Sequence, residues 1–358
     1  MKLMDLFEFM PKSKLSASYG SDKGNYPFFT SSNTIDKYCD DFIYDGEFLI
    51  IGDGGTGNCK HYNGKFSVSD HNYVLKPKSQ TNALAVKYFL EKDNYQILNY
   101  GFKGIGIKNV SKSYIQNIDY KYNQNFSQNE IVKNLVLIEK NIEREKQSIN
   151  SLDCLIKSRF IEMFGKKITD NSAICKFEDI CTGIIGLTYK PENIQNEGTI
   201  VLRSGNIQNN QLQLEDDVVR VDTKKIDKKK IIHDLDILMC SRNGSSRLVG
   251  KTCLIRNPKE EMTWGAFMMV IRTEFPYILQ TFMCSDYFKI QLTTTQTASV
   301  NQITNGMLRE YQVFKPTLDD ETEFSKFVKL VDKLKFNCQQ RIKLYQELLD
   351  KKMDEYFG

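Results

Sequence analysis

The sequence has few of the residues and runs that mark membrane, metal-binding and secreted proteins. Its 358 residues contain no apolar run near the roughly 18 residues that a membrane-spanning helix needs. The three histidines, His61, His71 and His233, are too few and too separated to predict a metal site. The nine cysteines occur singly, with no C-x-x-C pair, and no signal-peptide core precedes them. This pattern favours reduced thiols in a cytoplasmic protein.

Enzyme signatures are also missing from the sequence. It contains no G-x-S-x-G, no H-E-x-x-H and no D-x-D-x-D-G calcium loop. No Pro-Pro step occurs, so the Asn/Asp-Pro-Pro-Phe/Tyr signature of adenine methyltransferases is absent. The net charge of +4 permits an anionic partner without demanding one. We therefore predict a chain that carries no catalytic centre and no metal of its own.

Two glycine-rich loops come close to spelling nucleotide-binding motifs. Gly52-x-Gly54-x-x-Gly57 matches a dinucleotide fingerprint, but that motif needs a helix directly after it. The following residues read as strands around an Asn63-Gly64 step, which predicts a hairpin turn. The stretch 244–252 has one residue more between its glycines than a P-loop and continues into a strand-like CLI. We interpret both stretches as turns between strands. This interpretation disfavours a nucleotide-dependent oxidoreductase as the function of the chain.

The chain repeats one plan twice. Two long helical segments, 128–165 and 321–358, both end in an aromatic residue followed by glycine, 193 positions apart. Shorter matches precede them in the same order: FFTSSN with VLRSGN, LIIGDGG with LMCSRNG, and NVSKSYIQNI with QITNGMLREY. The repeat predicts two similar domains of α/β (α+β) class, each followed by a long helix. The predicted boundaries are 1–127, 128–165, 166–320 and 321–358.

The two helices share a narrow apolar stripe with three- and four-residue spacing, which is typical of a coiled-coil seam. The seam residues are Leu135, Ile138, Ile142, Ile149, Leu152, Ile156, Val328, Val331, Ile342, Tyr345 and Leu349. Glu145, Lys335 and Cys338 interrupt the stripe. Chain topology favours an antiparallel pair about 57 Å long, with the two domains related by a pseudo-twofold axis. The alternative is a pair of surface helices, each on its own domain.

Polar and basic side chains gather in the loops of both halves, and such groups hold phosphates and read base edges. The candidate DNA-binding residues are Lys12, Lys14, Lys23, Asn33, Asn58, Lys60, His61, Tyr62, Thr188, Tyr189, Lys190, Arg203, Asn206, Arg242, Asn243, Ser245 and Arg247. Loops are polar in most proteins, so these residues do not indicate DNA binding one by one. The indication comes from the occurrence of such loops in both halves of the chain. Two such domains at a fixed separation suit a DNA site in two halves.

The repeated sequence segments resemble those of the DNA-specificity subunit of type I restriction–modification systems. The resemblance rests on YPFFTSSNTIDKYCDDFIYDGEFLIIGDGGTGN and KFSVSDHNYVL in the first half. In the second half it rests on FEDICTGIIGLTYKPENI, EGTIVLRSGNI and DILMCSRNGSSRLVGK, with both helices and their Phe-Gly ends. It implies two target-recognition domains that each read half of a bipartite site in double-stranded DNA. It also implies conserved helices that set the gap and dock two methyltransferase (modification) subunits.

The same resemblance implies that this chain binds no cofactor and has no active site. S-adenosylmethionine, ATP and Mg²⁺ would belong to the partner subunits, with the restriction subunits joining through the complex. Two other interpretations stay open at this point. The chain could be the specificity partner of a fused restriction–methylation enzyme, or a coiled-coil adaptor that binds only protein.

Overall fold

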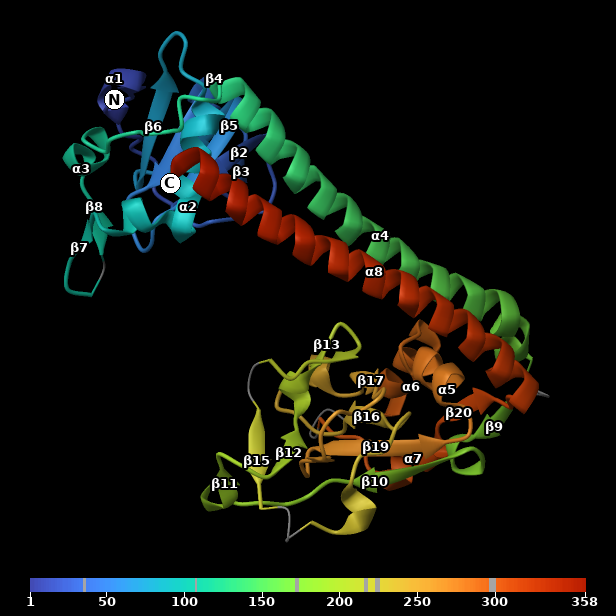
Figure 1. Cartoon of the computed structure of the whole chain (residues 1–358). Helices are drawn as coiled ribbons and strands as arrows, with labels where there is room; N and C mark the ends of the chain where they lie inside the picture. Colours follow the sequence, from blue (N-terminus) through green and yellow to red (C-terminus); the bar gives the residue numbers. More distant parts are fainter. Residues whose placement is uncertain (35–36, 107, 171–173, 216–217, 223–225, 296–300) are drawn as a thin grey trace. The chain divides into compact units, whose positions relative to one another are not determined.

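The computed structural model shows two compact units, each with its own sheets and its own stretch of two long helices (Figure 1). Unit 1 comprises Met1–Lys146 with Gln339–Gly358, and unit 2 comprises Gln147–Cys338. The structure describes residues 1–34, 37–106, 108–170, 174–215, 218–222, 226–295 and 301–358.

Unit 1 is built on a mixed sheet in the strand order β1-β6-β4-β5-β2-β3. Its strands are β1 (Phe7–Phe9), β2 (Tyr26–Phe29), β3 (Tyr38–Cys39), β4 (Tyr44–Gly52), β5 (Cys59–Val68) and β6 (Asn72–Pro77). Strand β4 is central and pairs antiparallel with both β5 and β6, whereas β2 runs parallel to β5. Side chains of β4 alternate between two cores: Leu49 and Ile51 pack with the helices, and Ile50 packs with Phe29 and Phe66.

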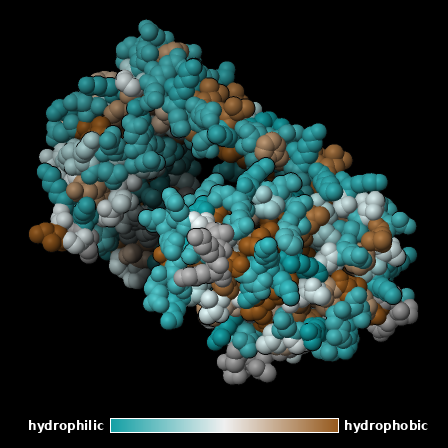
Figure 2. Space-filling model, turned by 60° about the horizontal axis from the view of Figure 1, so that its bottom comes forward, coloured by the Kyte–Doolittle hydropathy of each residue, from teal (hydrophilic) through white to brown (hydrophobic). Residues whose placement is uncertain are grey.

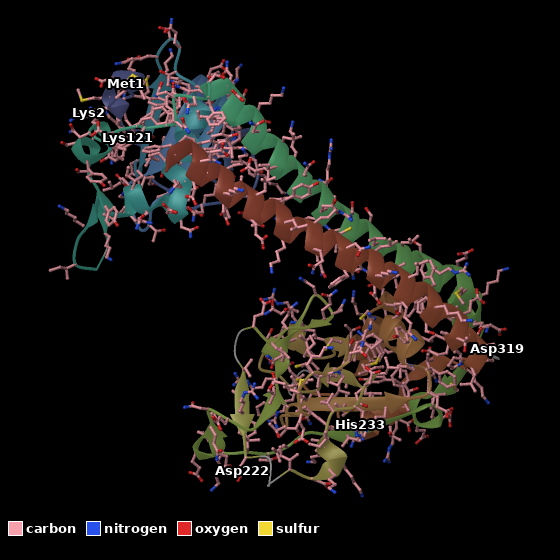
Figure 3. All side chains as sticks on the ribbon, in the orientation of Figure 1. Met1, Lys2, Lys121, Asp222, His233 and Asp319 are labelled. Carbon is pink, nitrogen blue, oxygen red and sulfur yellow. The ribbon has the colours of Figure 1, made fainter. Side chains whose placement is uncertain are left out.

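Short helices and the chain's first residues complete unit 1. The remaining elements are α1 (Leu3–Leu6), α2 (Ala83–Asn99), β7 (Phe102–Lys103), β8 (Asn109–Val110) and α3 (Lys112–Gln116). The N-terminal segment lies beside the residues that follow α3 (Figure 3), because Leu3 N donates to Ile118 O at 3.0 Å and Tyr120 N donates to Met1 O at 2.8 Å. Residues 1 and 120 are thus joined within one body.

Unit 2 contains sheets in the orders β10-β19-β16-β17 and β11-β15-β12-β18. Its strands are β9 (Ile174–Lys176), β10 (Cys181–Ile185), β11 (Ile194–Gln195), β12 (Thr199–Leu202), β13 (Ile207–Gln208), β14 (Gln211–Leu212), β15 (Val219–Val221), β16 (Ile237–Cys240), β17 (Thr252–Leu254), β18 (Met262–Trp264), β19 (Met268–Thr273) and β20 (Gln312–Phe314). Its short helices are α5 (Pro276–Met283), α6 (Asp286–Thr295) and α7 (Asn305–Glu310). Buried Trp264 is held by its indole N–H, which donates to Ile184 O at 2.9 Å.

The two units repeat the same internal hydrogen bonds. Asp53 N donates to His71 O at 3.1 Å in unit 1, and Ser241 N donates to Phe267 O at 3.0 Å in unit 2. Asp53 and Ser241 therefore hold equivalent positions, as do His71 and Phe267. The match of FFTSSN with VLRSGN is confirmed, because β2 and β12 each end beside a parallel strand in the same register.

The sequence match of LIIGDGG (49–55) with LMCSRNG (238–244) is wrong by one residue, because Asp53 and Ser241 hold equivalent positions. Residues 49–55 correspond to 237–243, because Leu49 and Ile51 face the helix-side core of unit 1, as Ile237 and Met239 do in unit 2. A shift of one residue would turn every side chain of the strand to the opposite face. The shared leucine and glycine letters misled the sequence match, and strand alternation decides it.

The long helices are α4 (Gln128–Thr169) and α8 (Leu318–Phe357), and they pack against each other antiparallel, as predicted. In unit 1, Asn134 Nδ2 donates to the Tyr356 hydroxyl at 2.8 Å. In unit 2, an Arg159 N–H donates to Glu323 Oε1 at 2.7 Å. The eleven predicted seam residues are buried or half-buried. The prediction that α4 ends at Gly165 is wrong, because the helix continues to Thr169. In this last turn, Lys167 forms an ion pair with Asp320 of α8.

The polar interruptions of the seam are paired across the two helices. Arg341 makes two hydrogen bonds to Glu145, at 2.7 and 2.8 Å. Lys335 is 7% exposed and donates to Asp153. Cys338 is buried in the seam as an apolar residue would be. In each unit, an ion pair between the two helices therefore takes the place of an apolar contact of the seam.

The predicted hairpin turn at Asn63-Gly64 is wrong. These residues lie inside β5, where Gly64 pairs with Gly46 of β4. Both glycines have positive φ, 144° and 122°, a conformation that favours glycine, and both strands continue through this pair. The chain reverses six residues earlier, in the glycine-rich stretch 53–58 between β4 and β5. That stretch is therefore a loop between strands, as predicted, and residues 244–251 likewise lead into strand β17.

Candidate nucleic-acid interface

In each unit, three loops are joined to one another by hydrogen bonds. In unit 1, Asn58 Nδ2 donates to Ser31 O at 3.1 Å, and Ser69 N donates to Phe29 O at 2.8 Å. These bonds add to the one between Asp53 and His71. The joined loops are 30–33, 53–58 and 69–71 in unit 1 and 203–206, 241–251 and 265–267 in unit 2.

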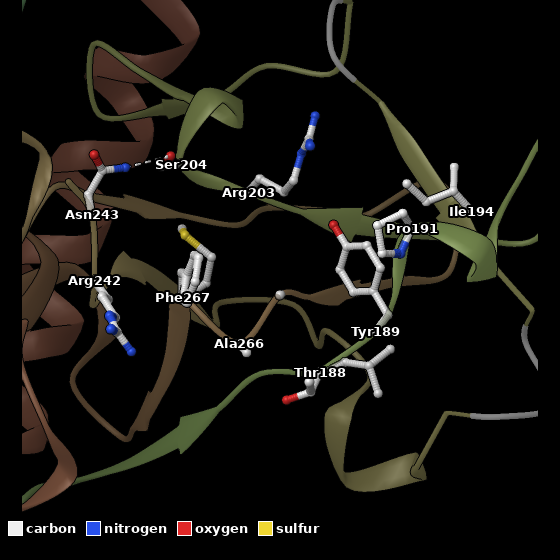
Figure 4. A pocket seen from close by; sticks show the side chains of 13 residues that line it. Thr188, Tyr189, Pro191, Ile194, Arg203, Ser204, Arg242, Asn243, Ala266 and Phe267 are labelled. Carbon is white, nitrogen blue, oxygen red and sulfur yellow. Dashed lines mark hydrogen bonds between the residues drawn. The ribbon is translucent and has the colours of Figure 1, made fainter. Parts of the chain in front are cut away.

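The unit 2 loops are joined in the same way. Gly265 N donates to Leu202 O at 3.0 Å, and Asn243 Nδ2 donates to Ser204 Oγ at 3.3 Å (Figure 4). The repeat thus preserves a platform of three loops, while the side chains on the platform differ between the units. A constant backbone with variable side chains is the arrangement expected of a recognition surface.

Unit 1 presents a charged cluster on this platform. Asp53 is buried and accepts from Lys12 and from His71 Nδ1, the latter at 3.1 Å. The Lys12 ammonium also lies 4.6 Å from the centre of the Tyr73 ring, and the His71 side chain is exposed. Lys60 Nζ donates to Thr30 O at 3.3 Å and supports the loop beneath. The sequence analysis proposed Lys12 and Lys60 but missed Asp53 and His71.

Asn58 and Asn206 are corrected from DNA-binding candidates to structural residues. Asn58 is 2% exposed, and its amide accepts from Gly52 N and donates to Ser31 O and Thr56 O. Asn206 is 1% exposed, and its amide accepts from Arg203 N at 2.8 Å and donates to Gln213 O at 3.1 Å. Burial leaves neither amide able to reach a DNA base.

The other unit 1 candidates lie on strand β5 and on exposed loops. His61 and Tyr62 belong to strand β5, where His61 Nε2 lies 2.8 Å from Glu47 Oε1 and Tyr62 packs edge-on against Phe29. Lys14, Lys23 and Asn33 are exposed on loops.

Unit 2 gathers five of its predicted residues around one pocket of about 470 Å³ (Figure 4). The lining includes the predicted residues Thr188, Tyr189, Arg203, Arg242 and Asn243, together with Ser204, Phe267 and others. Cationic, hydroxyl, amide and aromatic groups therefore converge on one concave surface. Such a surface can hydrogen-bond and stack against a polar aromatic ligand.

Besides Asn206, three unit 2 candidates lie outside the pocket lining. Lys190 is exposed, with its ammonium 3.5 Å from Glu192 Oε1. Ser245 N donates to Asn243 Oδ1 at 3.0 Å, so Ser245 supports the loop through its backbone. Arg247 is exposed on the same loop.

Phe267 is the residue of this pocket that the sequence analysis missed. Phe267 is 61% exposed, and the Arg242 guanidinium lies 5.4 Å from the centre of its ring. A large exposed aromatic side chain next to a cation is a recognition feature. Alignment of the two halves could have identified Phe267, because it occupies the position that His71 holds in unit 1.

A cysteine thiol lies directly before the loop 241–251 of unit 2. The nearby thiol of Cys240 is buried, and burial raises its pKa, so it stays protonated and weakly nucleophilic. Within the described ranges, His, Cys, Asp and Glu form no group of three or more that could hold a metal ion. Across those ranges, no helix is long and apolar enough to cross a membrane.

Comparisons with known proteins point to one family. Residues 1–153 match the family model of the type I restriction modification DNA specificity domain. The type I restriction enzyme EcoDI specificity subunit of Escherichia coli is 24% identical over 159 residues, which are 44% of this chain and 35% of that protein. A putative type I restriction enzyme specificity subunit of Haemophilus influenzae is 27% identical over 77 residues, 20% of each chain. The matches thus span about a third and a fifth of these two relatives.

Two solved structures share the fold over nearly the whole chain. The S subunit of a type I restriction–modification system from M. genitalium has a TM-score of 0.58 at 15% identity, covering 99% of this chain and 94% of that one. A chain from a structure on complex assembly of the type I R-M system has a TM-score of 0.57 at 12% identity, covering 99% and 96%.

The fold and the loops together define a duplicated architecture, in which each unit carries the same three-loop platform and a stretch of two antiparallel helices. The comparisons narrow this class and confirm the resemblance found in the sequence. Residues 1–153 match the type I restriction modification DNA specificity domain, and the fold of the chain is similar to that of solved type I chains.

Proposed function

We propose that this chain is a DNA-recognition subunit without catalytic activity, in which each unit reads one half of a bipartite site. The observation that carries the proposal is the repeated three-loop platform, with different side chains on an equivalent backbone. Unit 1 presents Lys12 and His71, and unit 2 presents Arg242 and Tyr189. Equivalent platforms with different donors and acceptors suit two half-sites of different sequence.

The long helices would set the gap between the half-sites and dock the modification subunits. Exposed leucines occur on these otherwise polar helices at positions that the repeat makes equivalent. Leu137 and Leu330 are 193 residues apart, and so are Leu155 and Leu348, and all four are exposed. Figure 2 shows a mostly hydrophilic surface with hydrophobic side chains exposed in small groups. Two equivalent sets of exposed leucines favour two copies of one partner.

The chemistry of the complex would lie in the partner subunits. S-adenosylmethionine and adenine methylation would belong to two modification subunits, and ATP and Mg²⁺ to restriction subunits, all acting on double-stranded DNA in the cytoplasm. A fused restriction–methylation enzyme as the partner is the alternative assignment. It predicts one neighbouring gene that encodes both activities, whereas the proposal predicts separate modification and restriction genes.

Footprinting of the complex with its cognate modification subunit tests the DNA-recognition proposal. We expect two protected patches separated by a fixed gap. One continuous patch would contradict two-unit reading. Unchanged electrophoretic mobility of DNA with the assembled complex would instead favour an adaptor that binds only protein.

Native mass spectrometry of the same complex tests the docking proposal. Leu137→Asp and Leu330→Asp are each expected to remove one modification subunit from a wild-type complex containing two, since each places a charge where an apolar contact is proposed. Lys133→Asp and Lys326→Asp are matched controls, because both lysines are exposed, equivalent in the repeat and one turn away. Full retention of both subunits by the two leucine variants would contradict this assignment.

A further inference from the structure

The backbone of Arg242 is fixed from two sides. Its N–H donates to Phe267 O at 3.0 Å, and Arg242 also forms a β-bridge with Gln302. On either side of it, Ile303 N donates to Ser241 O at 2.7 Å and Asn243 N donates to Asn301 O at 3.3 Å. A side chain on so firmly held a backbone can be aimed at a ligand with little loss of entropy on binding.

The guanidinium of Arg242 is oriented by an aromatic ring and not by a carboxylate. It lies 5.4 Å from the centre of the Phe267 ring. Among the described residues, no Asp or Glu lies within ion-pair distance of Arg242, whereas Arg220, Arg256 and Arg272 of the same unit pair with acids. A cation–π contact orients the guanidinium and leaves its N–H donors available for a ligand.

In the proposed DNA-recognition function, the N–H donors of Arg242 would face the edges of bases. A planar guanidinium fits guanine best, because it can donate two parallel hydrogen bonds to guanine O6 and N7 in the major groove. The other three bases do not offer this pair of adjacent acceptors in the major groove. Tyr189 lines the same pocket and adds a second aromatic surface (Figure 4).

We propose that Arg242, held against Phe267, reads a guanine in the half-site of unit 2. The inference rests on the proposed DNA-recognition function and makes it more specific. Unit 1 lacks this reader, because the residue equivalent to Arg242 is Gly54, one position after Asp53. The two half-sites therefore differ at this point, and loss of Arg242 relaxes one half only.

Methylation sequencing tests the inference with the full chain and its cognate modification subunit. The variants are Arg242→Ala, Arg242→Lys and Phe267→Leu, and Lys259→Ala is the control, since Lys259 is an exposed cation of the same unit that does not line the pocket. In Arg242→Ala, we expect one guanine of one half-motif to become any base, with roughly a ten- to hundred-fold loss of discrimination. The other half-motif stays unchanged.

The two further variants separate base reading from phosphate binding. Arg242→Lys keeps the charge but loses the planar fork, so it is expected to relax the same guanine. Phe267→Leu is expected to relax that position by a smaller factor. Uniformly weaker methylation at an unchanged motif in Arg242→Ala, restored by Arg242→Lys, would show a phosphate contact and overturn the inference.

The failure of the inference and the failure of the proposed function give different results. A wild-type split motif that Arg242→Ala leaves intact, or relaxes at a base other than guanine, overturns the inference alone. A wild-type complex without any split motif overturns both. Relaxation of the motif in Lys259→Ala equal to that in Arg242→Ala would also overturn the inference, because the effect would then not depend on the pocket.

Discussion

The ion pair between Lys335 and Asp153 predicts how the helix seam responds to substitution. Lys335 is nearly buried in the seam, whereas the Asp153 side chain is 47% exposed. The aspartate can therefore lose its partner and remain in water, but the lysine cannot. Asp153→Asn should destabilise the chain, and Lys335→Met should not.

The expected magnitudes follow from this asymmetry. Breaking a fully buried pair by removing one partner costs about 3–5 kcal/mol. Because Asp153 is half-exposed and screened by solvent, we expect about 1–2 kcal/mol for Asp153→Asn. Lys335→Met replaces a buried ammonium by an apolar chain of similar length, so stability should be unchanged or higher by up to about 1 kcal/mol.

Urea unfolding, followed by helix content, measures these differences. In the double variant, Asp153→Asn should add almost nothing to Lys335→Met, which gives a coupling energy of about 1 kcal/mol or more. A destabilising Lys335→Met combined with a neutral Asp153→Asn would refute the reasoning. The lysine would then stabilise the seam through its packing and not through its charge.

Two further predictions concern buried groups of unit 2. Glu321 of α8 accepts from Tyr277 N at 2.9 Å and Ile278 N at 3.1 Å, capping α5, so Glu321→Ala should lower the free energy of unfolding by about 2–3 kcal/mol in urea titrations. Burial raises the pKa of Glu321 above 4.5, so the folded chain binds this proton more tightly than the unfolded chain. The free energy of unfolding should therefore fall as pH rises from the pKa of Glu321 in the unfolded chain to its higher pKa in the folded chain. Glu321→Gln should lack this dependence on pH. Asn206→Ala should cost about 1–3 kcal/mol and lower the thermal midpoint, since two buried hydrogen bonds are lost; unchanged stability would contradict its structural role.

The sequence was a good guide to the helices because their seam is a local pattern. The three- and four-residue spacing predicts the buried stripe on each helix without knowledge of the partner. The charged interruptions could not be interpreted that way, because pairing Lys335 with Asp153 requires the antiparallel register, which spacing alone does not give. The strand match was off by one residue for a similar reason: the letters of LIIGDGG do not say which face is covered by helices.

The candidate site was predicted as a set of loops more reliably than as a set of residues. Repetition of the two halves pointed to loops that the structure joins by hydrogen bonds, and Arg242 and Tyr189 line a pocket there. Asn58 and Asn206 share the same polar chemistry, yet the fold buries them, and burial depends on contacts distant in sequence. Phe267 was missed because an aromatic residue before a strand normally indicates core.

The methylation motif produced by the wild-type chain with its cognate modification subunit tests the central claim most directly. Genome-wide sequencing of methylated adenines should give one motif in two defined halves, separated by a gap of fixed length and unspecified sequence. Removing one helical turn from both α4 and α8 should change the gap and leave both halves as they were. A continuous motif, or a gap that is unchanged by shorter helices, would contradict reading by two units spaced by the helix pair.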